Sequence, residues 1–82
     1  MMTTHKLKIL PEYLAPKMAG KKMFEIRNDD RNFRVGDEAI YTVYDNGITY
    51  EHVFVICYVT NYMQTSGYVV FGERFVETRE VF

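Results

Sequence analysis

The stretch GKKMFEIR, from Gly20 to Arg27, places three cations and one carboxylate within eight positions. A carboxylate beside an arginine and lysines can accept a hydrogen bond from the amino group of a base, while the cations bind a phosphate or a carbonyl oxygen. These residue types therefore indicate a nucleotide-like ligand. The same spacing also fits a row of surface ion pairs, which are common and contribute little to stability.

The stretch alternates between polar and apolar residues with the period of a β-strand. We expect Phe24 and Ile26 to enter a core and the opposite face to present Glu25 and Arg27 together. The two lysines at positions 21 and 22 then approach that face from the preceding turn.

Two residues outside this stretch extend the predicted site. Arg31 lies in the polar run Asn28–Asn32, which indicates an exposed loop, and adds a cation for phosphates. Tyr68 supplies a ring on which a base can stack. The predicted ligand-binding set is Lys21, Lys22, Glu25, Arg27, Arg31 and Tyr68.

Other chemistries lack the residues that they need. His5 and His52 lie far apart in the sequence without a ligand cluster, so we expect neither a metal nor another cofactor. Ser66 is the only serine and stands in an ordinary turn context, which does not favour a serine nucleophile. Cys57, the only cysteine, lies in the apolar run Val53–Val59 and is expected to be a buried, unreactive thiol.

Charge is divided unevenly along the chain. Residues 1–34 hold eight lysines and arginines against four acids, a net +4, whereas residues 35–82 hold two against seven, a net −5. The whole chain carries −1. This division can produce one basic surface on a nearly neutral protein, or two solvated faces that neutralise each other.

Length and composition describe a single domain, residues 1–82, with 48% hydrophobic and 26% charged residues. The single cysteine excludes an intrachain disulfide and favours a reducing compartment. The first residues show no secretory pattern, and no stretch approaches the roughly 20 apolar residues of a membrane span. We therefore expect a soluble, cytoplasmic protein without a membrane partner.

The predicted elements bracket the candidate site. Alternation predicts a strand at His5–Ile9, and Pro11 suits the first position of a short helix that Gly20 ends. Pro16 lacks a backbone donor, so this helix should be short, kinked or begun again at that residue. A second strand follows from Lys22.

Three more strands follow, joined by hairpins. The sequence Asp-Asn-Gly at 45–47 is typical of a type I′ turn between strands at Glu38–Tyr44 and Ile48–Thr60. A last strand runs from Tyr68 to about Phe75, and the tail Val76–Phe82 could add an edge strand or contact a second copy. This order predicts a mainly β (α+β) fold: a small antiparallel barrel of about five strands, with one short helix between the first two. An open sheet with one helix is the alternative.

Several motifs occur in an order that resembles a known family. LKI, PEY, GKK, FEIR, NDDR and VGD lie within residues 5–45, and GYVVFG occupies residues 67–72. The series resembles the small phage and bacterial proteins of the DUF3850 family, in the ASCH superfamily. The resemblance implies a PUA-like β-barrel with a cleft over the Lys-Glu-Arg region, and it implies recognition of RNA or modified nucleotides.

The resemblance also implies an alternative activity. Some ASCH proteins are amidohydrolases of N4-acetylcytidine that use a lysine and a threonine of one strand and a later glutamate. Lys22 matches the lysine, but Glu25 stands where the threonine would be, which removes the proposed nucleophile. Glu73 is the candidate for the later glutamate. As an enzyme, this protein would depend on Lys22 and Glu25 as an acid/base pair.

Three functions therefore remain open. The leading hypothesis is a non-enzymatic module that binds single-stranded RNA or a modified nucleotide. The second is the amidohydrolase of acylated nucleosides. The third is a phage-borne inhibitor that binds a host protein or nucleoprotein, for which the acidic residues 35–82 are the only support.

Overall fold

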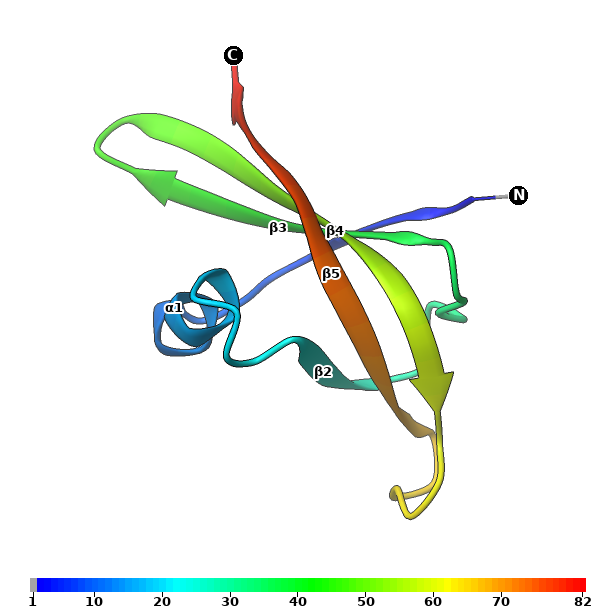
Figure 1. The fold of residues 1–82 in the computed structure, drawn as a ribbon. Helices are drawn as coiled ribbons and strands as arrows, with labels where there is room; N and C mark the ends of the chain where they lie inside the picture. The colour runs from blue at the N-terminus through cyan, green and yellow to red at the C-terminus, as the bar shows by residue number, and fades with distance from the viewer. Residues whose placement is uncertain (1) are drawn as a thin grey trace.

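Two long antiparallel strands, β4 (Ile48–Thr60) and β5 (Tyr68–Val81), form the centre of the sheet in a computed structural model that describes residues 2–82. Both are rich in the β-branched and aromatic residues that suit a pleated surface. Figure 1 shows the turns at 45–47 and 61–67 at opposite ends of the molecule. The register continues to the pair Thr49↔Val81, so most of the C-terminal tail belongs to β5.

The five-stranded sheet has the order β1-β3-β4-β5-β2. Its other strands are β1 (Thr4–Leu7), β2 (Phe24–Asn28) and β3 (Glu38–Asp45). The predicted mainly β fold of five strands, with one helix between the first two, is confirmed. The sheet curls into a half-barrel whose edges are β1 and β2, and it is mixed because β1 pairs parallel with β3.

Helix α1 (Pro11–Met18) is short, as its two prolines predict. Pro11 occupies the first turn, where a missing N–H has no effect, and the helix continues through Pro16 to its end. The carbonyl oxygen of Pro16 then accepts hydrogen bonds from the backbone N–H groups of Lys21 and Lys22, at 2.8 and 3.2 Å. This turn directs the chain from α1 into β2.

The hydrophobic core lies on the inner face of the half-barrel. It consists of Leu7, Phe33, Ala39, Tyr41, Phe54, Ile56, Val69 and Phe71. Phe33, from the loop after β2, packs between the rings of His5 and Phe71, with centroid distances of 4.7 and 4.8 Å. The His5 ring also contacts the buried carboxylate of Asp37, with 2.8 Å between Nε2 and Oδ2, which ties β1 to the segment that starts β3.

Two orientations differ from the sequence prediction. Phe24 and Ile26 are 44% and 54% exposed on the outer face, whereas Glu25 is 6% exposed on the inner face, so the predicted facing of β2 is wrong. The reason is a buried ammonium group on the inner side, described below, which pairs with this carboxylate. Cys57 is exposed rather than buried, because it follows the buried Ile56 and therefore faces outward, and the bulge between Ile56 and Tyr58 turns Tyr58 outward as well.

Candidate functional site

A buried lysine from the last turn of α1 lies behind the candidate site. The ammonium group of Lys17 pairs with the carboxylate of Glu73, and neither side chain is exposed to solvent. The same nitrogen lies 3.6 Å from Oε1 of Glu25 and 4.9 Å from the centre of the Tyr41 ring. Two carboxylates and an aromatic face therefore compensate the charge of this lysine in the interior.

Tyr41 completes the hydrogen bonding of Glu73. Its hydroxyl group lies 3.0 and 2.9 Å from the two carboxylate oxygens of Glu73, and its single O–H donates to this carboxylate. Burial raises the pKa of the Glu73 carboxyl above its usual value, although hydrogen bonds from Lys17 and Tyr41 oppose this rise. Burial, together with the nearby Glu73, also raises the pKa of Tyr41, so the phenol remains a neutral donor.

Glu25 connects this buried network to the surface. Its Oε2 accepts a hydrogen bond from Nζ of Lys22 at 3.1 Å. Its Oε1 lies 3.6 Å from both Nζ of Lys17 and Nη2 of Arg27, yet it accepts no hydrogen bond and is buried. A buried carboxylate oxygen without a donor is uncommon in folded proteins, so Glu25 keeps an unused capacity to accept a hydrogen bond.

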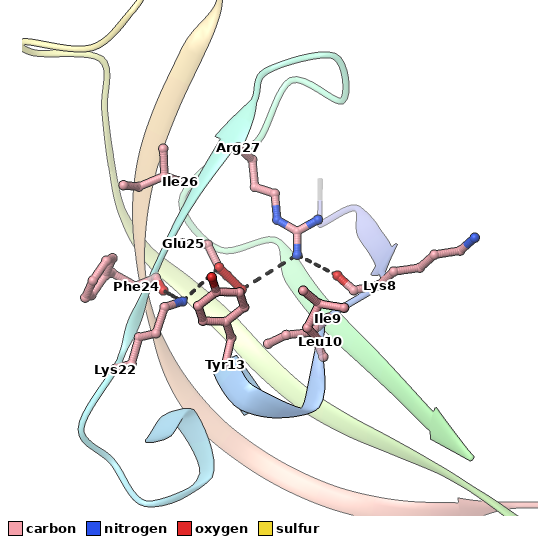
Figure 2. Close-up of a pocket in the computed structure, with 9 residues that line it drawn as sticks. All are labelled: Lys8, Ile9, Leu10, Tyr13, Lys22, Phe24, Glu25, Ile26 and Arg27. Atoms are coloured by element: carbon pink, nitrogen blue, oxygen red, sulfur yellow. Dashed lines mark hydrogen bonds and ion pairs between the residues drawn. The ribbon is translucent and has the colours of Figure 1, made fainter. Parts of the chain in front are cut away.

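A pocket of about 510 Å³ opens over this carboxylate. The lining residues are Lys8, Ile9, Leu10, Tyr13, Lys22, Phe24, Glu25, Ile26 and Arg27. Figure 2 shows the polar groups of Lys22, Glu25 and Arg27 gathered near the ring of Tyr13, while the side chains of Phe24 and Ile26 project from the other side of β2. The pocket thus has one apolar wall, from the segment after β1 and from α1, and one charged wall from β2 and the turn before it.

Two arginines bridge the open side of the half-barrel. Nη2 of Arg27 donates to the carbonyl oxygen of Lys8 at 2.8 Å, and Nη1 of Arg31 donates to that of Lys6 at 3.0 Å. Both donors come from β2 or the loop after it, and both acceptors lie on β1 or directly after it. These hydrogen bonds connect the two edge strands, which are not paired by backbone hydrogen bonds. Of the two arginines, Arg27 lines the pocket and Arg31 does not.

The structure brings together three of the six predicted binding residues. Lys22, Glu25 and Arg27 converge on the pocket, as their spacing predicted. Lys21 is exposed in the turn before β2 and does not line the pocket, and Arg31 faces β1 instead. Tyr68 starts β5 opposite Asn28, outside the pocket.

Sequence reasoning missed the residues that support the carboxylate. The sequence patterns did not single out Lys17 or Tyr41. A signal did exist for Glu73, because Val69, Phe71 and Glu73 share one face of β5 and the first two are buried. An acid in this position requires a buried cation nearby. Tyr13, on α1, was also missed as part of the pocket wall.

Residues 2–82 contain neither a metal-binding cluster nor a helix that could span a membrane. Within this range, no group of three or more histidine, cysteine, aspartate and glutamate side chains is arranged to hold a metal ion. No helix in the same range has the length and apolar character needed to cross a membrane.

The fold and the pocket define a small, mainly β domain with a recess between its edge strands and a buried carboxylate at its base. Residues 4–73 match the family described as a domain of unknown function, DUF3850. The chain belongs to this family. No curated protein matches the sequence.

Proposed function

We propose that this protein is a non-enzymatic binding module that holds a nucleotide-like ligand in the pocket. The ligand would be a free or modified nucleotide, or one nucleotide of a single-stranded RNA. The single observation that carries the proposal is the buried Oε1 of Glu25, which has no hydrogen-bond donor and lies between two cations. A ligand amino group that donates to this carboxylate would satisfy it.

The size and lining of the pocket support a ligand of this class. Its volume of about 510 Å³ lies within the range of small-molecule sites. Leu10 and Tyr13 offer an apolar wall against which a planar base can pack, opposite the charged groups of β2. The recess is therefore suited to a ring that carries polar groups along one edge.

The two cations at the pocket keep free donors. Arg27 uses one N–H for the carbonyl oxygen of Lys8, and a guanidinium group has five. Lys22 donates to the carbonyl oxygen of Phe24 and to Glu25, which leaves one of its three N–H groups. These remaining donors can bind a ligand carbonyl or phosphate oxygen beside the amino group that Glu25 accepts.

Binding without catalysis is favoured by the residue types at the pocket. None of the nine lining residues is a serine, threonine, cysteine or histidine, so the pocket offers no ordinary nucleophile. Glu73, the candidate for the later glutamate of a hydrolase, is engaged with Lys17 and Tyr41 and does not line the pocket. A cytoplasmic location would give such a module access to nucleotides and RNA.

Calorimetric titration with the four common ribonucleoside monophosphates and with short RNAs containing each base tests this proposal. We expect Glu25→Gln, Lys22→Ala and Arg27→Ala each to weaken binding about tenfold, the effect of losing one charge-assisted hydrogen bond. Lys21→Ala is the matched control, because it removes a nearby exposed cation that does not line the pocket. The affinity of this variant should stay within about twofold of wild type.

Equal binding by wild type and the three pocket variants would overturn the proposal. The two sources of ligand are distinguished by comparing each monophosphate with the RNA that contains it. Release of cytidine from N4-acetylcytidine, above the level of the Lys22→Ala variant, would establish the amidohydrolase instead.

A further inference from the structure

We infer that the outer face of β2, β5 and β4 is a binding surface for single-stranded RNA that leaves the pocket. This inference rests on the proposed function, because it assigns the path of the strand beyond the nucleotide held over Glu25. Apart from Phe24, which also lines the pocket, its residues lie outside the pocket. The surface is defined by the outward residues Phe24, Tyr58, Gly72 and Arg74.

Two exposed aromatic rings flank a glycine across three neighbouring strands. Phe24 of β2 is the register partner of Gly72 of β5, and Gly72 is also the partner of Tyr58 of β4. Phe24 is 44% exposed and Tyr58 is 63% exposed. Aromatic rings on the surface of a sheet are the groups on which RNA-binding domains stack unpaired bases.

The glycine keeps the space between these two rings open. A Cβ atom at Gly72 would lie 3.7 Å from Cβ of Tyr58 and 3.8 Å from Sγ of Cys57. With only hydrogen at this position, no side chain rises from β5 between the two aromatic residues. Because neighbouring strands lie about 4.8 Å apart, the Cα atoms of Phe24 and Tyr58 are about 10 Å apart, which leaves room for a planar ring between their side chains.

Lys22 lies between the pocket and this outer face. Its ammonium nitrogen is 5.0 Å from the centre of the Phe24 ring and 5.8 Å from the centre of the Tyr13 ring, which belongs to the pocket wall. Figure 2 shows Lys22 near both aromatic side chains, with Phe24 on the far side of β2. A phosphate that joins a nucleotide in the pocket to one stacked on Phe24 would therefore meet this cation.

The charge of the outer face also fits an anionic strand. Arg74 follows Gly72 by two positions, so it projects from the same face of β5, and it is exposed. The acids of this region, Glu25 and Glu73, point to the inner face and are buried. The outward residues of β2, and those of β5 from Tyr68 to Arg74, include no acid, although the whole chain has a net charge of −1.

The experiment compares the affinity for a mononucleotide with that for RNAs of two to eight nucleotides, by fluorescence anisotropy competition. We expect wild-type affinity to rise with length over the first few added nucleotides. Tyr58→Ala should lower the affinity for the longer RNAs about tenfold, as expected for one lost base stack, and should leave the mononucleotide affinity unchanged. Tyr58→Phe should retain the affinity, because it keeps the ring.

A second variant and a control make the result specific. Arg74→Gln should lower the affinity for the longer RNAs several-fold and reduce the salt dependence of their binding. The affinity for the mononucleotide should not change. Tyr44→Ala is the matched control, because Tyr44 is a comparably exposed tyrosine near the β3–β4 turn. Its affinity should equal that of wild type for every length.

Several outcomes would overturn the inference. An affinity that does not change with RNA length would contradict it. An equal loss of affinity for the mononucleotide and for the longer RNAs in Tyr58→Ala would also contradict it. A monomer–dimer equilibrium that Tyr58→Ala abolishes, without an effect on RNA, would show that a second copy uses this face. If longer RNAs bind through Tyr58 but no mononucleotide binds, the result would support RNA binding by the outer face and contradict nucleotide binding in the pocket.

Discussion

Lys17 and Glu73, 56 residues apart in sequence, form an ion pair from which solvent is fully excluded. The pair fixes the last turn of α1 against β5, and it places the lysine ammonium behind Glu25. The pocket wall that contains Tyr13 belongs to the same helix. The geometry of the pocket therefore depends on an ion pair whose two residues do not line it.

Replacing Lys17 should destabilise the fold strongly. In Lys17→Met, the carboxylates of Glu73 and Glu25 lose their buried cation, and an uncompensated buried charge costs about 3–5 kcal/mol. Urea denaturation at neutral pH measures this loss. The same replacement at the exposed Lys21 should change the free energy of unfolding by less than about 0.5 kcal/mol. Similar values for the two variants would contradict the role assigned to the ion pair.

Protonation of Asp37 should lower the stability of the fold at acidic pH. Burial alone would raise the pKa of this carboxyl, but hydrogen bonds from His5 and from the backbone N–H groups of Thr3 and Arg34 hold the pKa below the ordinary value of 3.8. A depressed folded pKa contributes stability above the unfolded pKa and loses it as the pH falls through the folded value. We therefore expect the free energy of unfolding to decline below about pH 4.

The variant Asp37→Asn tests this assignment. It should be less stable by about 1–3 kcal/mol at pH 7, since a buried hydrogen-bond network is broken, and its loss of stability below pH 4 should be shallower. Asp30→Asn, in the exposed loop, should follow the wild-type pH profile. An unchanged acid slope in Asp37→Asn would assign the acid sensitivity to other carboxyl groups.

Replacement by alanine should lower thermal stability more at Gly47 than at Gly72. Gly47 has a φ of +81° in the β3–β4 turn, where an L side chain costs about 1–2 kcal/mol. Gly72 has no such backbone strain, and its added Cβ would meet its neighbours at ordinary contact distances of 3.7 Å or more. Thermal unfolding should show a clear drop in midpoint for Gly47→Ala and a smaller change for Gly72→Ala. The reverse order would contradict the turn geometry.

Local patterns were sufficient to predict the strands and the turn. The Asn-Gly pair has positive φ at both residues, +51° and +81°, as a type I′ turn requires. The sequence also predicted that Lys22, Glu25 and Arg27 share one region, since this follows from strand alternation and one short turn.

Long-range pairing decided what local patterns could not. The predicted orientation of β2 was wrong because alternation does not say which side of a strand is buried. In the structure, the side of Glu25 is buried, because its carboxylate lies next to the buried ammonium group of Lys17. The parallel pairing of β1 with β3 has no local signal, because the two strands are separated by α1 and β2. The bulge that turns Tyr58 outward likewise depends on how β4 meets β5.

The position of the pocket between the two edge strands has a kinetic consequence. β3, β4 and β5 are consecutive in sequence and can pair through short turns, whereas β1 and β2 must each close a long loop to reach their partners. Because loop closure is entropically unfavourable, we expect the three-stranded meander to form early and the edge strands to dock late. The recess over Glu25 would then be the last part of the domain to assemble, and binding competence would arise only in the final step of refolding.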